Sequence, residues 1–112
     1  MKNVIPFLKL LKAYNSRDWF NENREKFELA RNEFFAFVES LIYDLQKIDN
    51  RLSGLEAKNC VFRLNRDVRF SKNKSPYKIN FAAILREGGK KSDLPGYYIH
   101  IEPGNCFLAA GI

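Results

Sequence analysis

The stretch NREKFELARNEFFAFVESLIYDLQKID, residues 23–49, predicts a long packed helix. Its apolar residues recur at three- and four-residue steps, and this spacing lines them up on one face of a helix. The residues of this face are Phe27, Ala30, Phe34, Phe37, Val38, Leu41, Leu45 and Ile48. The charged residues between them, Arg31 among them, fall mostly off the face, and we interpret them as solvated charge.

Two shorter helices are predicted before the long one. Residues 4–14 alternate apolar and polar side chains with a helical period. Asn15 and Ser16 follow, and they offer an N-cap for a helix that starts at Arg17. Asn23 is in position to cap the long helix. The first half of the chain is therefore predicted to be helical over residues 1–52.

After a loop at residues 50–59 the apolar pattern changes to a period of two, which is typical of strands. The predicted strands cover residues 60–65, extending to 70, then 79–86, 97–102 and 106–110. Short connections rich in Gly, Pro, Ser and Asn join them, and such connections favour an antiparallel meander. We therefore expect the α+β class, with N-terminal helices packed on an antiparallel β-meander. The 112 residues fit one domain, with its sheet in residues 60–112.

The last predicted strand runs to the end of the sequence, which closes on Ala109-Ala110-Gly111-Ile112. A sheet edge that exposes apolar residues and unpaired backbone groups tends to pair with another strand. We therefore expect the chain to be a fragment of a longer domain. We also expect it to self-associate through this open edge.

The positive charge of the chain is concentrated in residues 58–78. This segment holds seven Lys or Arg residues and one acid, Asp67, which gives +6, the formal net charge of the whole chain. Such a local excess predicts a site for an anion. A strand through residues 60–70 would place Arg63, Asn65, Asp67 and Arg69 on one face. Arg66 would fall on the apolar face, and it breaks the pattern.

These residues define a candidate binding site for a phosphorylated or other anionic small molecule. The arginines would hold the anion in the geometry that guanidinium groups favour, and Asp67 would orient one of them through a paired hydrogen bond. Residues from the following loop would complete the pocket. The candidate ligand-binding residues are Arg63, Arg66, Asp67, Arg69, Lys74, Tyr77 and Lys78.

Acid–base chemistry has fewer candidates. Tyr98, His100 and Glu102 alternate along one predicted strand and so share a face. If this face continues the one that bears Arg63, then His100 and Glu102 are placed for proton transfer. Asp67 is the third candidate catalytic residue. The residues leave open whether the protein is an enzyme.

Two other interpretations of the basic segment stay open. It could be a nucleic-acid-binding module whose cations contact phosphates, or a structural domain whose Arg–Asp network fastens the loop to the sheet. We expect a cytoplasmic protein that does not bind membranes, because the sequence shows neither a signal peptide nor a long apolar run. One His and two distant Cys predict no metal site, and no cofactor is expected.

The basic segment also carries the pattern R-x-x-R-D-x-R-F-x-x-[DN]-K-x-x-Y, in residues 63–77. With the flanking stretches at residues 19–24 and 96–104, it resembles the DUF2461 (TIGR02453) family of conserved proteins of unknown function. The resemblance covers nearly the whole chain. Members of that family are roughly twice as long, so the resemblance implies that this is the N-terminal half. It implies no activity, substrate or cofactor.

Overall fold

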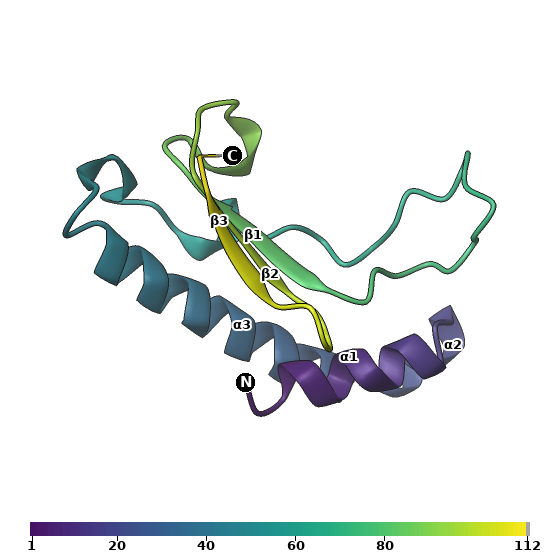
Figure 1. The fold of residues 1–112 in the computed structure, drawn as a ribbon. Helices are drawn as coiled ribbons and strands as arrows, with labels where there is room; N and C mark the ends of the chain where they lie inside the picture. Colours follow the sequence, from purple (N-terminus) through teal and green to yellow (C-terminus); the bar gives the residue numbers. More distant parts are fainter. Residues whose placement is uncertain (112) are drawn as a thin grey trace.

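The computed structural model describes residues 1–111 and places three helices before a three-stranded antiparallel sheet (Figure 1). The helices are α1 (Val4–Ala13), α2 (Arg17–Glu22) and α3 (Arg24–Leu45). The strands are β1 (Phe81–Leu85), β2 (Tyr97–Ile101) and β3 (Phe107–Ala110), in the spatial order β1-β2-β3. Short 3₁₀ turns lie at Asn50–Leu52, Ala57–Asn59 and Gly89–Lys91. The predicted α+β class, with helices first and an antiparallel meander second, is confirmed.

Helix α3 buries a narrower stripe than the sequence predicted. The buried residues recur at four-residue steps: Ala30, Phe34, Val38 and Ile42. Phe37 lies beside this row and is 37% exposed, while Ile48 lies beyond the end of the helix and is 82% exposed. The assignment of these two residues to the packed face was wrong, whereas Phe27, Leu41 and Leu45 of the predicted face are partly buried against the core.

Tertiary contacts help to start the first helix, and a local cap starts the second. The backbone N–H groups of Asn3 and Val4 donate to the carboxylate of Glu33 on α3, at 2.9 and 3.1 Å. Helix α2 begins as predicted, because Ser16 Oγ accepts a hydrogen bond from the Trp19 N–H. Asn23 is the N-cap residue of α3, as predicted, but its side chain makes no capping hydrogen bond and donates to the Trp19 carbonyl oxygen.

The sheet presents one face to the helices and one face away from them. Residues that are paired across antiparallel strands share a face. Phe81, Ala83, Leu85 and Ile99 belong to the core formed with α1 and α3. The opposite face carries Tyr98 and His100, which alternate with Ile99 along β2. The prediction that Tyr98 and His100 share a face is confirmed.

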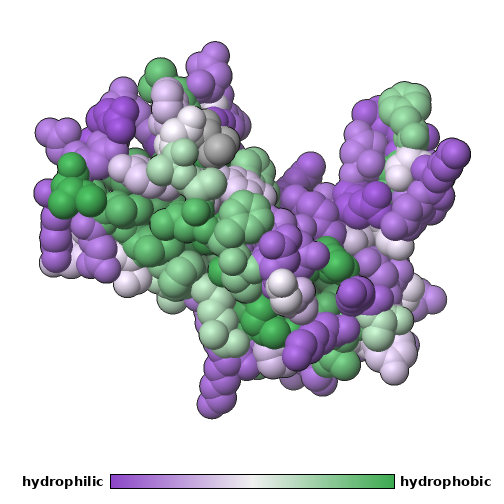
Figure 2. Space-filling model, in the orientation of Figure 1, coloured by the Kyte–Doolittle hydropathy of each residue, from purple (hydrophilic) through white to green (hydrophobic). Residues whose placement is uncertain are grey.

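Residues 60–70 do not form a strand of the sheet, contrary to the prediction. Two backbone hydrogen bonds, Phe62 N–H to Ala82 and Ile84 N–H to Cys60, attach the start of the segment to the outer side of β1. The chain then leaves the sheet, and residues 66–76 project from the body as a largely hydrophilic loop (Figures 1 and 2). Phe70, expected on an apolar face, is 94% exposed. Past the sheet the segment pairs with the returning side of the loop, through an isolated bridge between Asn65 and Tyr77. This pairing ends at Arg66, whose N–H donates to Pro76, so the charged residues after it have no strand beside them.

Strand β3 is an edge of the sheet, and no strand within residues 1–111 pairs with its outer side. Phe107 and Leu108 on this strand are 44% and 58% exposed. Figure 2 shows hydrophobic surface over α3 and β3 on the face in view. An edge of this kind offers unpaired backbone groups and apolar side chains to a second strand.

We propose that copies of the chain associate along β3. Light scattering is expected to show a molecular mass that rises with concentration. Leu108→Lys is expected to suppress this rise, because a lysine on an edge strand disfavours pairing. Leu29→Lys is the matched control, since Leu29 on α3 has the same exposure of 58%. A monomeric mass for the unaltered chain at high concentration would contradict the proposal.

Candidate functional site

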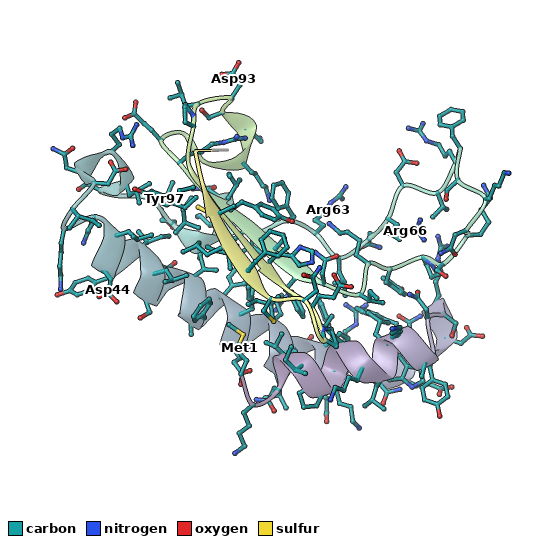
Figure 3. All side chains as sticks on the ribbon, in the orientation of Figure 1. Met1, Asp44, Arg63, Arg66, Asp93 and Tyr97 are labelled. Atoms are coloured by element: carbon teal, nitrogen blue, oxygen red, sulfur yellow. The ribbon has the colours of Figure 1, made fainter. Side chains whose placement is uncertain are left out.

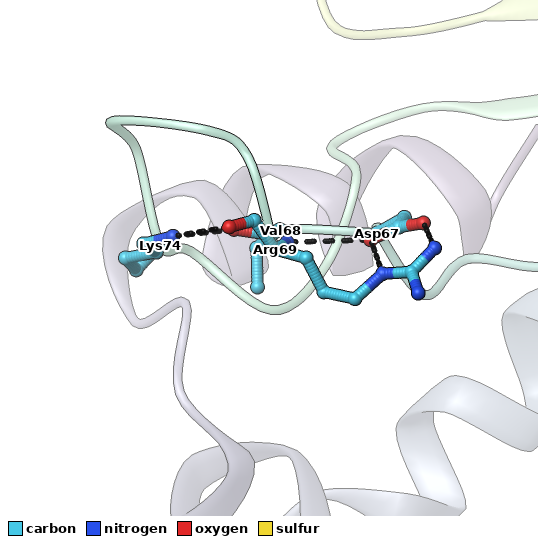
Figure 4. Close-up of polar contacts among 4 residues, drawn as sticks. All are labelled: Asp67, Val68, Arg69 and Lys74. Carbon is cyan, nitrogen blue, oxygen red and sulfur yellow. Dashed lines mark hydrogen bonds and ion pairs between the residues drawn. The ribbon is translucent and has the colours of Figure 1, made fainter.

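Three of the predicted site residues form hydrogen bonds within the projecting loop. Arg69 donates from Nε and a terminal nitrogen to the two carboxylate oxygens of Asp67, at 3.1 and 2.9 Å, and Lys74 Nζ donates to the Val68 carbonyl oxygen (Figure 4). The side chains of Asp67 and Arg69 are 64% and 77% exposed. The hydrogen bonds from Arg69 lower the pKa of Asp67.

The predicted paired hydrogen bond between Asp67 and an arginine is therefore present, and it lies on the exposed surface of the loop. The ion pair lies within the loop at a separation of two residues, where water screens both charges. Exposed pairs of this kind contribute little to the stability of a fold. Asp67, Arg69 and Lys74 thus shape the loop, and none of them lines a cleft of the body.

Arg66 lies at the base of the loop and joins its two sides (Figure 3). Its guanidinium donates to the Ser75 carbonyl oxygen at 3.1 Å and to Ser71 Oγ at 3.4 Å. Its backbone N–H donates to Pro76. A guanidinium has five N–H donors, so these contacts hold the group in place and leave donors for a ligand.

Asn15 connects the end of the loop to the helices. Its side-chain amide donates to the Tyr77 carbonyl oxygen at 2.9 Å and accepts from the Tyr77 N–H at 3.1 Å, across 62 residues. The Tyr77 ring is buried and stacks on Phe20 with 4.3 Å between ring centroids. Sequence analysis treated Asn15 only as part of a helix cap and missed this contact, which no local pattern could have indicated.

One cleft collects Arg66, Lys78 and Glu102 from the predicted site, and we call it the loop cleft. Its volume is about 410 Å³. It lies between the end of α1, the base of the loop, the residues that precede β1 and the residue that follows β2. The lining residues are Lys12, Asn15, Arg66, Asn73, Ser75, Tyr77, Lys78, Ile79, Asn80 and Glu102. The lining residues that were not among the predicted site residues are Lys12, Asn15, Asn73, Ser75, Ile79 and Asn80.

The environment of Lys78 disfavours the charged form of its side chain. Burial lowers the pKa of its ammonium group, and the positive charge of Arg63 lowers this pKa further. The ammonium also lies 5.8 Å from the centre of the Phe62 ring. An anion in the loop cleft would offset both effects.

Replacing Lys78 with methionine is expected to raise the melting temperature near neutral pH. The pKa of Lys78 is lowered in the folded protein, so the unfolded chain holds its proton more tightly, and folding is disfavoured at pH values below the folded-state pKa. This disadvantage disappears as the pH rises toward the ordinary pKa of lysine. Melting curves across this pH range should therefore show the difference between variant and unaltered protein shrinking at high pH.

The control for this prediction is Lys72→Met, at an exposed position of the loop. It is expected to leave the melting temperature unchanged at every pH. Equal behaviour of the two variants would show that Lys78 is not electrostatically disfavoured in the fold.

The candidate acid–base residues form a chain of hydrogen bonds along β2. The Tyr98 hydroxyl lies 3.1 Å from His100 Nδ1, and His100 Nε2 lies 2.7 Å from Glu102 Oε1. The side chains of His100 and Glu102 are 14% and 26% exposed. The His100 ring also stacks on Phe107 at 4.8 Å. Burial raises the pKa of Tyr98, with a further contribution from the charge of Glu102.

This chain reaches the loop cleft through Glu102 alone. The structure therefore places Glu102 in the same cleft as Arg66 and Lys78, with His100 behind it, and not beside Arg63 as the sequence suggested. A carboxylate fixed by an imidazole on one oxygen is oriented in the way that positioned acid–base groups require.

Arg63 does not belong to the loop cleft. It lines a second cleft, on the other side of Tyr77, between α3 and residues 58–65. Tyr77 lines both clefts. The predicted site is thus divided into three parts: Arg63 in one cleft, Arg66 and Lys78 in the other, and Asp67, Arg69 and Lys74 on the loop surface.

Residues 1–111 contain no group of three or more His, Cys, Asp and Glu side chains arranged to hold a metal ion. None of the helices in this part of the chain is sufficiently long and apolar to cross a lipid bilayer.

The fold and the two basic clefts define an α+β protein with cation-lined concave surfaces. Its sequence matches the model of the family described as "Conserved hypothetical protein (DUF2461)" over residues 3–112, and the chain belongs to this family. The resemblance inferred from the basic segment is thus confirmed. No curated protein and no solved structure gives a significant match.

Proposed function

We propose that the loop cleft binds a small phosphorylated or carboxylate ligand. The observation that carries the proposal is the arrangement of charges: Lys12, Arg66 and Lys78 line the same cleft. Among the described residues, Glu102 is the acid that lines it, and His100 already occupies one oxygen of that carboxylate. The cleft therefore holds an excess of positive charge that an anion would neutralise.

The donors of the cleft suit an oxyanion. The Arg66 guanidinium is held by Ser75 and Ser71 before any ligand arrives, which reduces the ordering that binding requires. Hydrogen bonds between a guanidinium and a phosphate or carboxylate are among the stronger ones in proteins. The lowered pKa of Lys78 adds to the preference, because a bound anion favours the charged ammonium.

The position of Glu102 supports a role in proton transfer to a bound ligand. His100 orients this carboxylate, and Tyr98 in turn contacts the imidazole, so the group is held at the wall of the cleft. Glu102 would exchange a proton with the ligand, and His100 would act as its positioning residue.

Arg66→Gln is expected to weaken phosphate binding at least about tenfold, since it removes a charged hydrogen-bond donor. Inorganic phosphate is the probe, titrated at constant ionic strength. Isothermal calorimetry measures the affinity, and the shift in melting temperature gives an independent readout because a ligand of the native state stabilises it. Arg17→Gln, on the exposed face of α2, is the matched control. Absence of binding, or equal affinity in both variants, would contradict the proposal.

Nucleic-acid binding is the second candidate, and a separate observation favours it. Phe70 is 94% exposed on the projecting loop, and the Arg69 guanidinium lies 5.6 Å from its ring centre. An exposed aromatic ring among cations is a surface on which unpaired bases stack. Affinity for single-stranded DNA that falls steeply with salt and is lost in Phe70→Ala would support this function in place of the first.

A further inference from the structure

The second cleft, which we call the helix cleft, is lined by cations over an aromatic floor. Its volume is about 340 Å³, within the range of small-molecule sites. The charged residues of its lining are Arg24, Arg31, Lys58, Arg63 and Lys90. Within the described part of the chain, each charged residue of this lining is a cation.

Helix α3 supplies one wall through residues spaced three and four apart. Arg24, Phe27 and Arg31 lie on one face of the helix, so cations and aromatic rings alternate along it. The Arg24 guanidinium lies over the Phe20 ring at 5.4 Å, and that of Arg31 lies over the Phe27 ring at 5.5 Å. The interpretation of Arg31 as solvated charge overlooked this alternation.

The opposite wall comes from residues 58–65 and from Lys90. Lys90 Nζ donates to the Val61 carbonyl oxygen at 2.8 Å, which fixes its position at the rim. The ion pairs found within residues 1–111 include neither Arg24, Arg31 nor Arg63. Arg31 and Arg63 face the cleft from opposite walls, and a bound anion would be attracted by both guanidiniums.

The floor of the cleft is apolar and is built of aromatic rings, with Phe20 and Phe27 tilted by 49° to each other. Phe20 stacks on Tyr77 with an interplanar angle of 17°, and Phe27 lies nearly parallel to Phe81 at 15°. Phe20 and Phe27 are themselves 4.8 Å apart. Rings in such arrangements offer faces and edges to another aromatic group. Inorganic phosphate alone would leave this surface uncovered.

We propose that the helix cleft binds a small anion that has a flat aromatic body. The body lies against the half-buried rings of Phe27, Phe35 and Phe62, and the acidic group meets the guanidiniums of Arg31 and Arg63. The acidic group is a carboxylate, as in an aryl acid, or a phosphate, as in a nucleoside monophosphate. The site is separate from the loop cleft, because Arg31 lines only the helix cleft and Arg66 lines only the loop cleft.

The test uses four probes on isotope-labelled protein, followed by the backbone amide signals of residues 58–65. Naphthoate represents the aryl acids, and adenosine monophosphate represents the nucleotides. Naphthalene carboxamide has the same rings without the charge, and inorganic phosphate has charge without rings. We expect at least one of the two aromatic anions to shift these signals with a Kd on the order of 1 mM or tighter. The anion with the lower Kd shows whether the cleft prefers a carboxylate or a phosphate.

Arg31→Gln is expected to weaken the binding of that anion about tenfold. It should leave the affinity of the loop cleft for phosphate unchanged. Arg17→Gln is again the control, and circular dichroism confirms that both variants are folded. Because Arg31 is exposed on α3, its replacement leaves the core intact. Arg63→Gln provides a second variant on the opposite wall.

Three results would overturn the proposal. The first is that neither aromatic anion shifts the signals of residues 58–65. The second is that the neutral carboxamide binds as tightly as naphthoate. The third is that both Arg31→Gln and Arg63→Gln bind the aromatic anion as tightly as the unaltered protein does.

Discussion

Replacing Phe34 with alanine is expected to lower the free energy of unfolding by about 3–5 kcal/mol. Phe34 is fully buried at the centre of the packed row on α3, and its ring lies 5.4 Å from that of Phe81 on β1. The substitution removes apolar contacts from both the helix layer and the sheet, and it leaves a cavity that a close-packed core fills only in part. A loss of this size is a large share of the stability of a small protein.

Chemical denaturation followed by circular dichroism measures this loss. Phe37→Ala is the matched control, because Phe37 belongs to the same helix but is 37% exposed. It should cost about 1 kcal/mol, in proportion to the smaller area that it buries. Equal losses in the two variants would contradict the packing of α3 described above.

Replacing Asn15 with alanine is expected to cost about 2 kcal/mol of stability and to weaken phosphate binding in the loop cleft. The Asn15 amide satisfies both backbone groups of Tyr77, and alanine would leave these partly buried groups unpaired. The loop ends directly before Tyr77, and Lys78 follows it in the chain. The substitution would therefore remove a contact that holds this wall of the cleft to the helices.

The measurement combines chemical denaturation with calorimetry of phosphate binding. Asn32→Ala, on the exposed face of α3, serves as the control. It should be neutral or slightly stabilising, because alanine favours a helix more than asparagine does. If Asn15→Ala binds phosphate as the unaltered chain does, then Asn15 does not position the cleft.

The secondary structure was largely predictable because it follows from local periodicity. The four-residue recurrence of Ala30, Phe34 and Val38 indicates a helix in any surroundings, and the alternation in residues 97–102 indicates a strand. The cap at Ser16 is also a local contact. The strand predicted over residues 60–70 was wrong for the complementary reason: a strand needs a neighbour, and the sequence pattern does not report whether one is present.

The candidate site was predictable in its composition but not in its arrangement. The basic segment identified Arg63, Arg66 and Lys78, yet the structure assigns Arg63 to a different cleft from the other two. The buried Tyr77, which Asn15 holds in place, lies between the cleft of Arg63 and the cleft of Arg66 and Lys78. Arg24 and Arg31 were missed because charge on a helix is usually solvated, and only the fold shows which wall stands opposite.

By itself, the sequence determined the order of helices and strands, the concentration of positive charge in residues 58–78 and membership of the family. These properties depend on spacing and composition along the chain. Only the tertiary structure decided which cations share a cleft, that Asp67 and Arg69 remain exposed, and that Glu102 joins His100 to Arg66 and Lys78. These properties depend on contacts between residues far apart in the chain, such as Asn15 and Tyr77, and local patterns carry no information about them.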